Sequence, residues 1–210
     1  MMAKNPKRPG HLSIRPADLR DLPSTQPLFR IHSAGGRHPM AWNGFRNFGP
    51  LQSMRWDPHP PPASHHHGVG VAYCATDPVT TFAEVFQERR RIRIGSLRAL
   101  SAWFPARDLR LLDLTGNWPT RNGASFSLFA APKSTCRNWA RGIHELSAEL
   151  SLELDGLYVH STMMPGKNVV LFSSAHSAFP IAPAISLPLD HPVIRRLAQD
   201  ASHQLSWPVV

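Results

Sequence analysis

Alternating apolar and small residues predict a β-strand over residues 68–76 (GVGVAYCAT). One face of this strand would carry Val69, Val71, Tyr73 and Ala75. The opposite face would carry Gly70, Ala72 and Cys74. Such small residues indicate that another part of the molecule approaches this second face closely.

A helix is predicted immediately after this strand. Asp77 is a suitable N-cap residue, and Pro78 suits the first helical position, where no amide hydrogen is needed. Apolar residues then recur at helical spacing to about Arg90 and would form a buried stripe of Val79, Phe82, Ala83 and Phe86. Glu84 lies roughly 150° from this stripe at about 100° per residue, so we expect it to face either solvent or a cleft.

Short apolar runs predict four further strands, at residues 27–32, 109–114, 157–161 and 168–173. A second helix would be capped by Ser134 and would bury Trp139, Ile143, Leu146 and Leu150. Asp190 and Pro192 would start a C-terminal helix, at about residues 192–204, which buries Val193, Ile194, Leu197 and Ala201. Strands mixed irregularly with a few helices predict an α+β fold.

Length and composition predict one folded domain. The 210 residues suit a single hydrophobic core, and 42% hydrophobic against 18% charged residues exclude general disorder. Residues 1–22 are basic and interrupted by prolines, so we expect a loosely held arm that precedes a domain at 23–210. Residues 37–68 are expected to be a long loop, because Gly, Pro, His and Asn are frequent there and no regular period is present.

A surplus of basic residues favours anionic partners. Lys and Arg exceed Asp and Glu by 9, which suits nucleic acid, phosphorylated small molecules or an acidic protein. The run Arg89-Arg90-Arg91-Arg93 is compatible with binding to a phosphate backbone and equally with a solvated helix end. We expect no direct binding of nucleic acid, because the six tryptophans are scattered and not interleaved with this run.

Cysteine and histidine usage predicts neither disulfides nor a metal site. Cys74 and Cys136 are too few for a disulfide framework, which indicates a reducing compartment. No apolar run approaches the roughly 18 residues that span a bilayer, and no apolar signal follows the basic N-terminus, so we expect a cytoplasmic protein without membrane contact. His65-His66-His67 suggests metal binding at first sight, but adjacent loop residues diverge and no matching Cys, Asp or Glu spacing lies nearby.

The common catalytic motifs are missing from the sequence. It contains no glycine-rich phosphate loop after a strand, no serine nucleophile elbow and no paired-cysteine motif. The remaining candidates for chemistry are Arg30, Arg55, Tyr73, Glu84 and Ser161. Each of them alone also fits a structural or solvated role, since most charged residues face water.

The order of several short motifs resembles the RES domain, a family named after its Arg, Glu and Ser. These motifs are LFR at 28–30, RWD at 55–57, VAYCA at 71–75, FAEV at 82–85, LRLLDLTG at 109–116, WAR at 139–141 and DGLYVHS at 155–161, followed by Asn168 and Leu171-Phe172. The resemblance is strongest over residues 27–172. The chain departs from the family pattern at residues 58–67, where a Pro/His-rich insertion separates the arginine motif from the tyrosine strand.

The resemblance implies a fold similar to ADP-ribosyltransferases and a toxin of a toxin–antitoxin module that degrades NAD by hydrolysis or phosphorolysis. NAD would be the substrate, inorganic phosphate a second candidate substrate, and no cofactor is expected. An Xre-like antitoxin protein would be the inhibitor. The implied pocket consists of Arg30, Arg55, Tyr73, Glu84 and Ser161.

These residue types suit chemistry on NAD. The guanidinium groups of Arg30 and Arg55 would bind the pyrophosphate. Tyr73 would stack on the cationic nicotinamide, Glu84 would stabilise an oxocarbenium-like ribose, and Ser161 would orient the substrate. Two other functions stay open at this stage, ADP-ribosyl transfer onto a protein and nucleic-acid binding without enzymatic activity. Self-association and assembly with an antitoxin are open as well.

Overall fold

The computed structural model describes residues 4–210 and shows one α+β domain around a mixed, eight-stranded sheet with the order β1-β7-β8-β9-β5-β2-β6-β10. Strands β7 and β8 are parallel, and the other neighbours in this sheet are antiparallel. The strands are β1 (Leu19–Leu22), β2 (Leu28–Ser33), β5 (Val71–Ala75), β6 (Arg98–Trp103), β7 (Leu109–Asp113), β8 (Gly156–His160), β9 (Lys167–Phe172) and β10 (Ile185–Pro188), and a separate pair is formed by β3 (Phe48–Gly49) and β4 (Ser64–His65).

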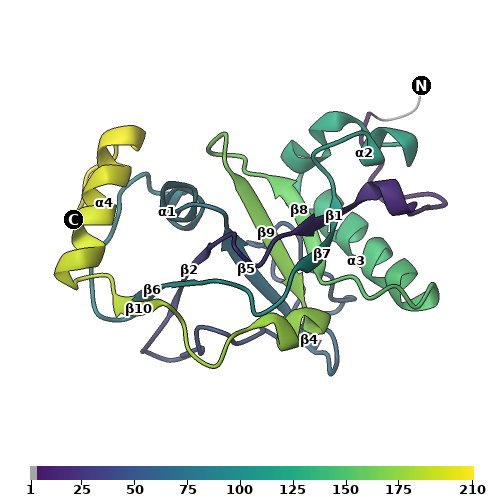
Figure 1. Ribbon diagram of the computed structural model, residues 1–210. Helices are drawn as coiled ribbons and strands as arrows, with labels where there is room; N and C mark the ends of the chain where they lie inside the picture. The colour runs from purple at the N-terminus through teal and green to yellow at the C-terminus, as the bar shows by residue number, and fades with distance from the viewer. Residues whose placement is uncertain (1–3) are drawn as a thin grey trace.

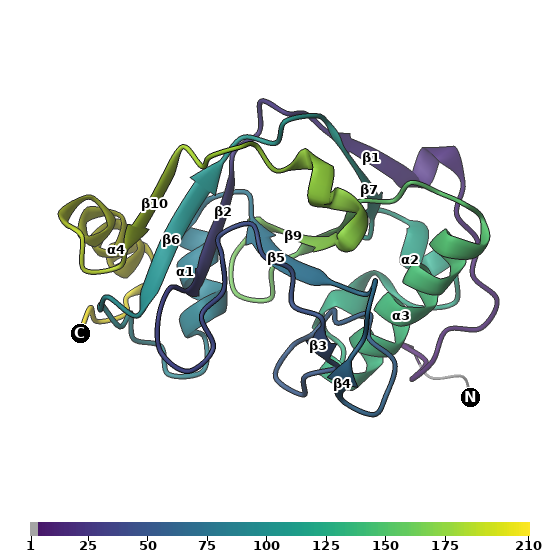
Figure 2. The ribbon, with the colours of Figure 1, turned by 90° about the horizontal axis from the view of Figure 1, so that it is seen from below.

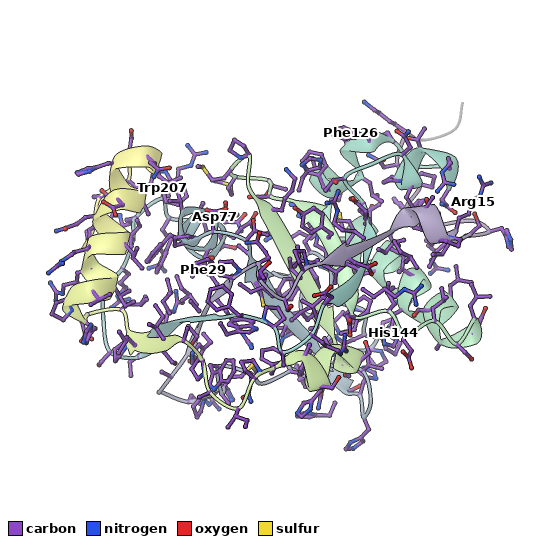
Figure 3. The ribbon with its side chains drawn as sticks, in the orientation of Figure 1. Arg15, Phe29, Asp77, Phe126, His144 and Trp207 are labelled. Atoms are coloured by element: carbon purple, nitrogen blue, oxygen red, sulfur yellow. The ribbon has the colours of Figure 1, made fainter. Side chains whose placement is uncertain are left out.

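The helices gather at two ends of this sheet. α1 (Pro78–Phe86) and α4 (Pro192–Leu205) lie together at one end, and α2 (Trp118–Arg121) and α3 (Lys133–Glu149) lie at the other (Figures 1 and 2). Three short 3₁₀ helices complete the fold, namely η1 (Pro16–Asp18), η2 (Phe126–Ala130) and η3 (Ser173–Ala178). Figure 3 shows Phe29, Asp77 and Trp207 at the α1 and α4 end, with Phe126 and His144 at the other. In residues 4–210, no helix has the length and apolar character needed to cross a bilayer.

The hydrophobic core follows the two helix groups. At one end, Phe82 and Phe86 of α1 pack with Ile194 and Ala198 of α4 and with Phe29 of the sheet. At the other end, α3 packs on β8 and β9 through a cluster that includes Trp139, Ile143, Leu157 and Val170. The opposite face of the sheet is covered in part by η3, whose Ala175 and Ala178 lie against Ala72, Cys74 and Trp103.

Strand β5 has the two faces that alternation predicts. Val71 and Tyr73 belong to the α3 cluster, whereas Ala72 and Cys74 belong to the cluster on the other face. The expected close approach occurs at Gly70, just before the strand. A Cβ atom there would lie 2.7 Å from both Asn47 Oδ1 and Ser173 Oγ. The long loop therefore packs against this position, and glycine is needed for the contact.

The structure corrects several element boundaries. Asp77 caps α1 as predicted, with its Oδ1 accepting from the Thr80 amide at 2.7 Å, but the helix ends at Phe86 and not near Arg90. α3 begins at Lys133 after Pro132, so Ser134 lies inside the helix and does not cap it. His191, rather than Asp190, caps α4.

Three strands of the main sheet, β6, β10 and β1, are not predicted from the sequence. In β6, the five residues after Arg98 are all buried. Both faces of the strand are therefore covered, and its sequence does not alternate between apolar and polar residues. β10 is a short edge strand that ends in Pro188, a residue that argues against a strand when the sequence is read alone. β1 lies inside the segment expected to be a loosely held arm.

That N-terminal segment is packed onto the domain. β1 pairs with β7 along its full length. The indole Nε1 atoms of Trp118 and Trp139 donate hydrogen bonds of 2.9 Å to the carbonyl oxygens of Ser13 and Pro6. The described part of the predicted arm is therefore held by buried tryptophans, while residues 1–3 lie outside the described residues.

Candidate active site

A carboxylate, a hydroxyl and a carboxamide meet where α1 faces the β8–β9 hairpin. Glu84 Oε1 accepts hydrogen bonds from Ser161 Oγ at 2.6 Å, from Asn168 Nδ2 at 2.9 Å and from the Thr162 amide at 3.1 Å. Glu84 Oε2 accepts from Gln87 Nε2 at 3.2 Å. Three donors on one oxygen suit a carboxylate, which only accepts, and they fix its position. We call Glu84, Ser161 and Asn168 the Glu84 cluster.

The local fold explains how these residues meet. Glu84 lies off the buried stripe of α1 and projects toward the end of β8, which is followed directly by Ser161. The hairpin turn is closed by a 3.2 Å hydrogen bond from the Ser161 amide to the Gly166 carbonyl. Asn168 stands in β9 opposite Ala75 of β5, so its side chain lies on the face of the sheet that α1 covers.

The Ser161 hydroxyl donates one hydrogen bond and accepts two. Its oxygen accepts hydrogen bonds from the amides of Met163 and Met164, at 3.0 and 3.1 Å. Its single proton is donated to Glu84, and Ser161 is 5% exposed. Ser161 therefore orients Glu84 and holds the turn.

A second polar network surrounds Tyr73. The Tyr73 hydroxyl donates to Asp57 Oδ1 at 2.7 Å and accepts from the Trp56 amide at 3.1 Å. Arg46 Nη2 lies 2.5 Å from the same carboxylate oxygen, and Asp57 is fully buried. Burial, followed by the charge of Asp57, raises the pKa of Tyr73 well above its ordinary value. The phenol therefore stays protonated and works as a donor to Asp57.

Tyr73 and the Glu84 cluster lie on the same face of the sheet. Tyr73 pairs with Val170 in β9, two residues along from Asn168, so Tyr73 and Asn168 are diagonal neighbours on adjacent strands. Tyr73 as a whole is only partly buried even though its hydroxyl is bonded inside the protein. The hydroxyl end is thus fixed, and part of the residue stays accessible beside the Glu84 cluster.

Arg55 is tied to the Tyr73 network through its chain neighbour Trp56. Its Nη1 atom donates to the Ala131 carbonyl and lies 3.6 Å from Cys136 Sγ, at the start of α3. The side chain is partly exposed. One nitrogen of the guanidinium therefore holds the loop to α3.

Arg30 does not join the Glu84 cluster. Its neighbour Phe29 packs with α1, so alternation along β2 directs Arg30 to the opposite face of the sheet. There its Nη1 donates to the carbonyl oxygens of Trp42 and Gly44, at 3.0 and 2.7 Å. Arg30 is 7% exposed, and burial lowers the pKa of its guanidinium. Its observed contacts hold the loop around residues 40–44 against the sheet.

Of the five predicted residues, the structure joins Glu84 and Ser161 directly and places Tyr73 on the same face. Sequence reasoning missed Asn168 as a member of the cluster, and it missed the Asp57 and Arg46 side chains that hold Tyr73. Only Asp57 and Asn168 had a sequence signal, because both fall in segments that resemble the RES domain. In the part of the chain that the structure describes, no three His, Cys, Asp or Glu side chains are grouped to hold a metal ion.

Comparison with known proteins agrees with this architecture. The family model described as the RES domain matches residues 27–190. Because this match spans most of the 210 residues, the chain belongs to the RES domain family. A search of curated protein sequences gives no significant match.

A solved structure supports the fold assignment. The chain is similar to a chain in the crystal structure of the M. tuberculosis MbcT–MbcA toxin–antitoxin complex, with a TM-score of 0.53 and 18% sequence identity. The similarity covers 85% of this chain and 92% of that one. At this identity the comparison shows a shared fold, and the predicted α+β class with a mixed sheet and flanking helices is confirmed.

Proposed function

We propose that this protein cleaves the nicotinamide–ribose bond of NAD, with Glu84 as the catalytic carboxylate. The observation that carries the proposal is the hydrogen bonding of Ser161 and Asn168 to a single oxygen of Glu84, on the sheet face that also holds Tyr73. Membership of the RES domain family supports it. NAD enters as the substrate, and no cofactor is required.

The chemistry of the bond suits a fixed carboxylate. The bond between ribose C1′ and the nicotinamide nitrogen breaks with its electron pair leaving on nitrogen, so a cationic pyridinium becomes neutral nicotinamide. Positive charge develops on the ribose, and a carboxylate already held in place stabilises it without reorganisation. Within residues 4–210, Glu84 Oε2 accepts one hydrogen bond, from Gln87 at the C-terminal end of α1, and we assign this oxygen to the ribose.

An acceptor completes the reaction at C1′. With water, Glu84 takes the proton as the new C–O bond forms, and the products are ADP-ribose and nicotinamide. With phosphate, a phosphate oxygen forms the new bond, and the products are nicotinamide and ADP-ribose that carries the phosphate at C1 of this ribose. Tyr73 and Arg55 are both partly buried residues. In this proposal the Tyr73 ring stacks on nicotinamide, and the Arg55 guanidinium binds the pyrophosphate.

We extend the proposal to a toxin role with an antitoxin partner. The fold is shared with a chain of the M. tuberculosis MbcT–MbcA toxin–antitoxin complex. An Xre-like antitoxin would then silence the activity in the producing cell. Induced production of the protein is expected to stop bacterial growth, and production of the Glu84→Gln variant is expected to leave growth unchanged.

Product analysis tests the enzymatic proposal directly. Purified protein is incubated with NAD, with and without inorganic phosphate, and the products are separated. Free nicotinamide with ADP-ribose indicates hydrolysis, and free nicotinamide with phosphate-dependent formation of ADP-ribose 1″-phosphate indicates phosphorolysis. When the NAD is labelled in its ADP-ribose part, label attached to protein would instead indicate ADP-ribosyl transfer. Absence of nicotinamide under all conditions contradicts the proposal.

A further inference from the structure

A cavity of about 740 Å³ lies beyond the end of α1 and is lined by Val85 and Phe86 of that helix, by residues between Glu88 and Arg98, and by Val210. Four arginines and one acidic residue, Glu88, contribute to its wall. The arginines are Arg89, Arg91, Arg93 and Arg98. We call this space the arginine cavity. Its volume falls within the range of about 300–1,000 Å³ typical of ligand sites.

The four arginines in the wall of this cavity outnumber its one acidic side chain. The ion pairs in residues 4–210 include none of the four arginines. All four side chains are exposed, and Arg98 lies over the Phe86 ring at 5.4 Å. Guanidinium groups without carboxylate partners attract an external anion and can bind it bidentately.

Apolar side chains lie among these arginines. Leu97 is 63% exposed and Val85 is 38% exposed, and both line the arginine cavity. Solvated aliphatic side chains beside unpaired cations form a mixed surface. Such a surface fits a ligand that carries acidic and apolar groups together.

The scaffold behind the cavity is fixed. Ile92 is fully buried between α1 and α4 and forms a parallel bridge with Val209. The amides of Ile92 and Ile94 donate to the carbonyls of Pro208 and Val210, at 2.9 and 2.7 Å. Alternation around Ile92 leaves Arg91 and Arg93 exposed, so the fold presents these two charges from an anchored segment.

The arginine cavity differs from the proposed catalytic site. Its lining residues include no member of the Glu84 cluster. A ligand in the cavity would therefore not occupy the position of the ribose. The inference below is independent of the reaction proposed for Glu84.

We infer that the arginine cavity binds an acidic segment of a partner protein that also carries aliphatic side chains. The carboxylates would pair with Arg91, Arg93 and their neighbours, and an aliphatic side chain would cover Leu97. A nucleic acid fits less well, because the only aromatic side chain that lines the cavity, Phe86, is buried and covered by Arg98. Base stacking on aromatic rings is therefore not provided.

Binding of a model peptide tests this inference on the full-length protein. The probe is a fluorescently labelled peptide that repeats Glu-Glu-Leu, and its competitors are a Glu-Glu-Ser peptide and an oligouridylate of matched length. The double variant Arg91→Glu/Arg93→Glu reverses two charges in the cavity. The matched control, Lys4→Glu/Arg8→Glu, reverses two exposed charges in the N-terminal segment, which lies at the other end of the molecule (Figures 1 and 2).

The inference predicts that Arg91→Glu/Arg93→Glu weakens peptide binding by at least about 10-fold and that the control changes it by less than about 2-fold. The Leu97→Ser variant should bind the Leu and Ser peptides with similar affinity, whereas the parent prefers the Leu peptide. Unchanged thermal unfolding of each variant shows that folding is retained. Tighter binding of oligouridylate, equal loss in both charge-reversal variants, or no binding of the Leu peptide to the parent would overturn the inference.

Discussion

The Ser161 hydroxyl donates a 2.6 Å hydrogen bond to Glu84 Oε1, and this contact joins residues 77 positions apart in the chain. It ties the exposed side of α1 to the β8–β9 hairpin. Because Ser161 also accepts the amides of Met163 and Met164, the hairpin turn and the carboxylate share one hydrogen-bond network. The position of Glu84 therefore depends on how the β8–β9 hairpin packs against α1.

A substitution at Gly166 tests whether the hairpin packs against α1 in this way. A Cβ atom at this position would collide with Thr80 Oγ1 and would lie 2.5 Å from Asp77 Oδ2, at the N-terminus of α1. We expect Gly166→Ala to push the hairpin away, to lower the free energy of unfolding by about 1–3 kcal/mol and to reduce nicotinamide release. Urea unfolding and the NAD assay measure these effects. Gly116→Ala serves as the control, because no atom lies within 4 Å of its Cβ position. Equal losses of stability and of nicotinamide release in the two variants would contradict this packing of the hairpin against α1.

Asn168 is expected to act as a positioning residue for Glu84. The Asn168→Asp variant keeps the shape but replaces a donor 2.9 Å from Glu84 Oε1 with a like charge. Repulsion disfavours two neighbouring carboxylates, so the acidic limb of the pH–activity profile should move to higher pH and activity should fall. Asn138→Asp on α3 adds the same charge elsewhere and should leave the profile in place. An unchanged profile in Asn168→Asp would refute the positioning role.

The Tyr73 network should contribute more to stability through Asp57 than through the phenol. Asp57→Asn leaves Arg46 without its buried counter-charge and is expected to cost about 3 kcal/mol. Tyr73→Phe removes one hydrogen bond to Asp57 and one from the Trp56 amide, and should cost about 1–2 kcal/mol. Urea unfolding of both variants gives the ranking, and a larger loss in Tyr73→Phe would contradict it.

One buried and three partly buried histidines predict how stability changes with pH. Burial is the main cause that lowers the pKa of His32, His59, His144 and His160 from the ordinary value of 6.5. Below pH 6.5 the unfolded chain then binds more protons than the folded protein, so the free energy of unfolding falls as the pH drops through this value. Urea midpoints measured on both sides of pH 6.5 test the sign. In the His144→Gln variant the decline should be smaller, and a stability that rises on acidification would contradict the argument.

Sequence analysis works best where local patterns determine local structure. The Asp77-Pro78 start of α1 and the alternating faces of β5 are confirmed, since capping and period-two burial are written in adjacent residues. β6 has no such pattern because it is buried on both faces. The packed N-terminal segment depends on hydrogen bonds to Trp118 and Trp139, more than 100 residues further along the chain, and no local pattern predicts such partners.

The residues of the site also fall into those that the sequence predicts and those that depend on contacts between distant segments. Glu84 and Ser161 could be predicted from the resemblance to the RES domain, and the structure brings them into contact. Whether Arg30 faces the same side of the sheet as Glu84 depends on strand register, which the sequence of β2 alone does not determine. The partners of Tyr73 come from a loop without periodicity, so Arg46 could not be predicted.

The most direct test of the account is nicotinamide release from NAD by the Glu84→Gln variant. Glu88→Gln is the matched control, because Glu88 lies four residues further along the chain, past the end of α1, and its side chain is 77% exposed. We predict that Glu84→Gln lowers the rate by about 10²–10³ while Glu88→Gln keeps the parental rate, with both variants folded. A Glu84→Gln protein that releases nicotinamide as fast as the parent would contradict the central claim that this carboxylate performs the chemistry.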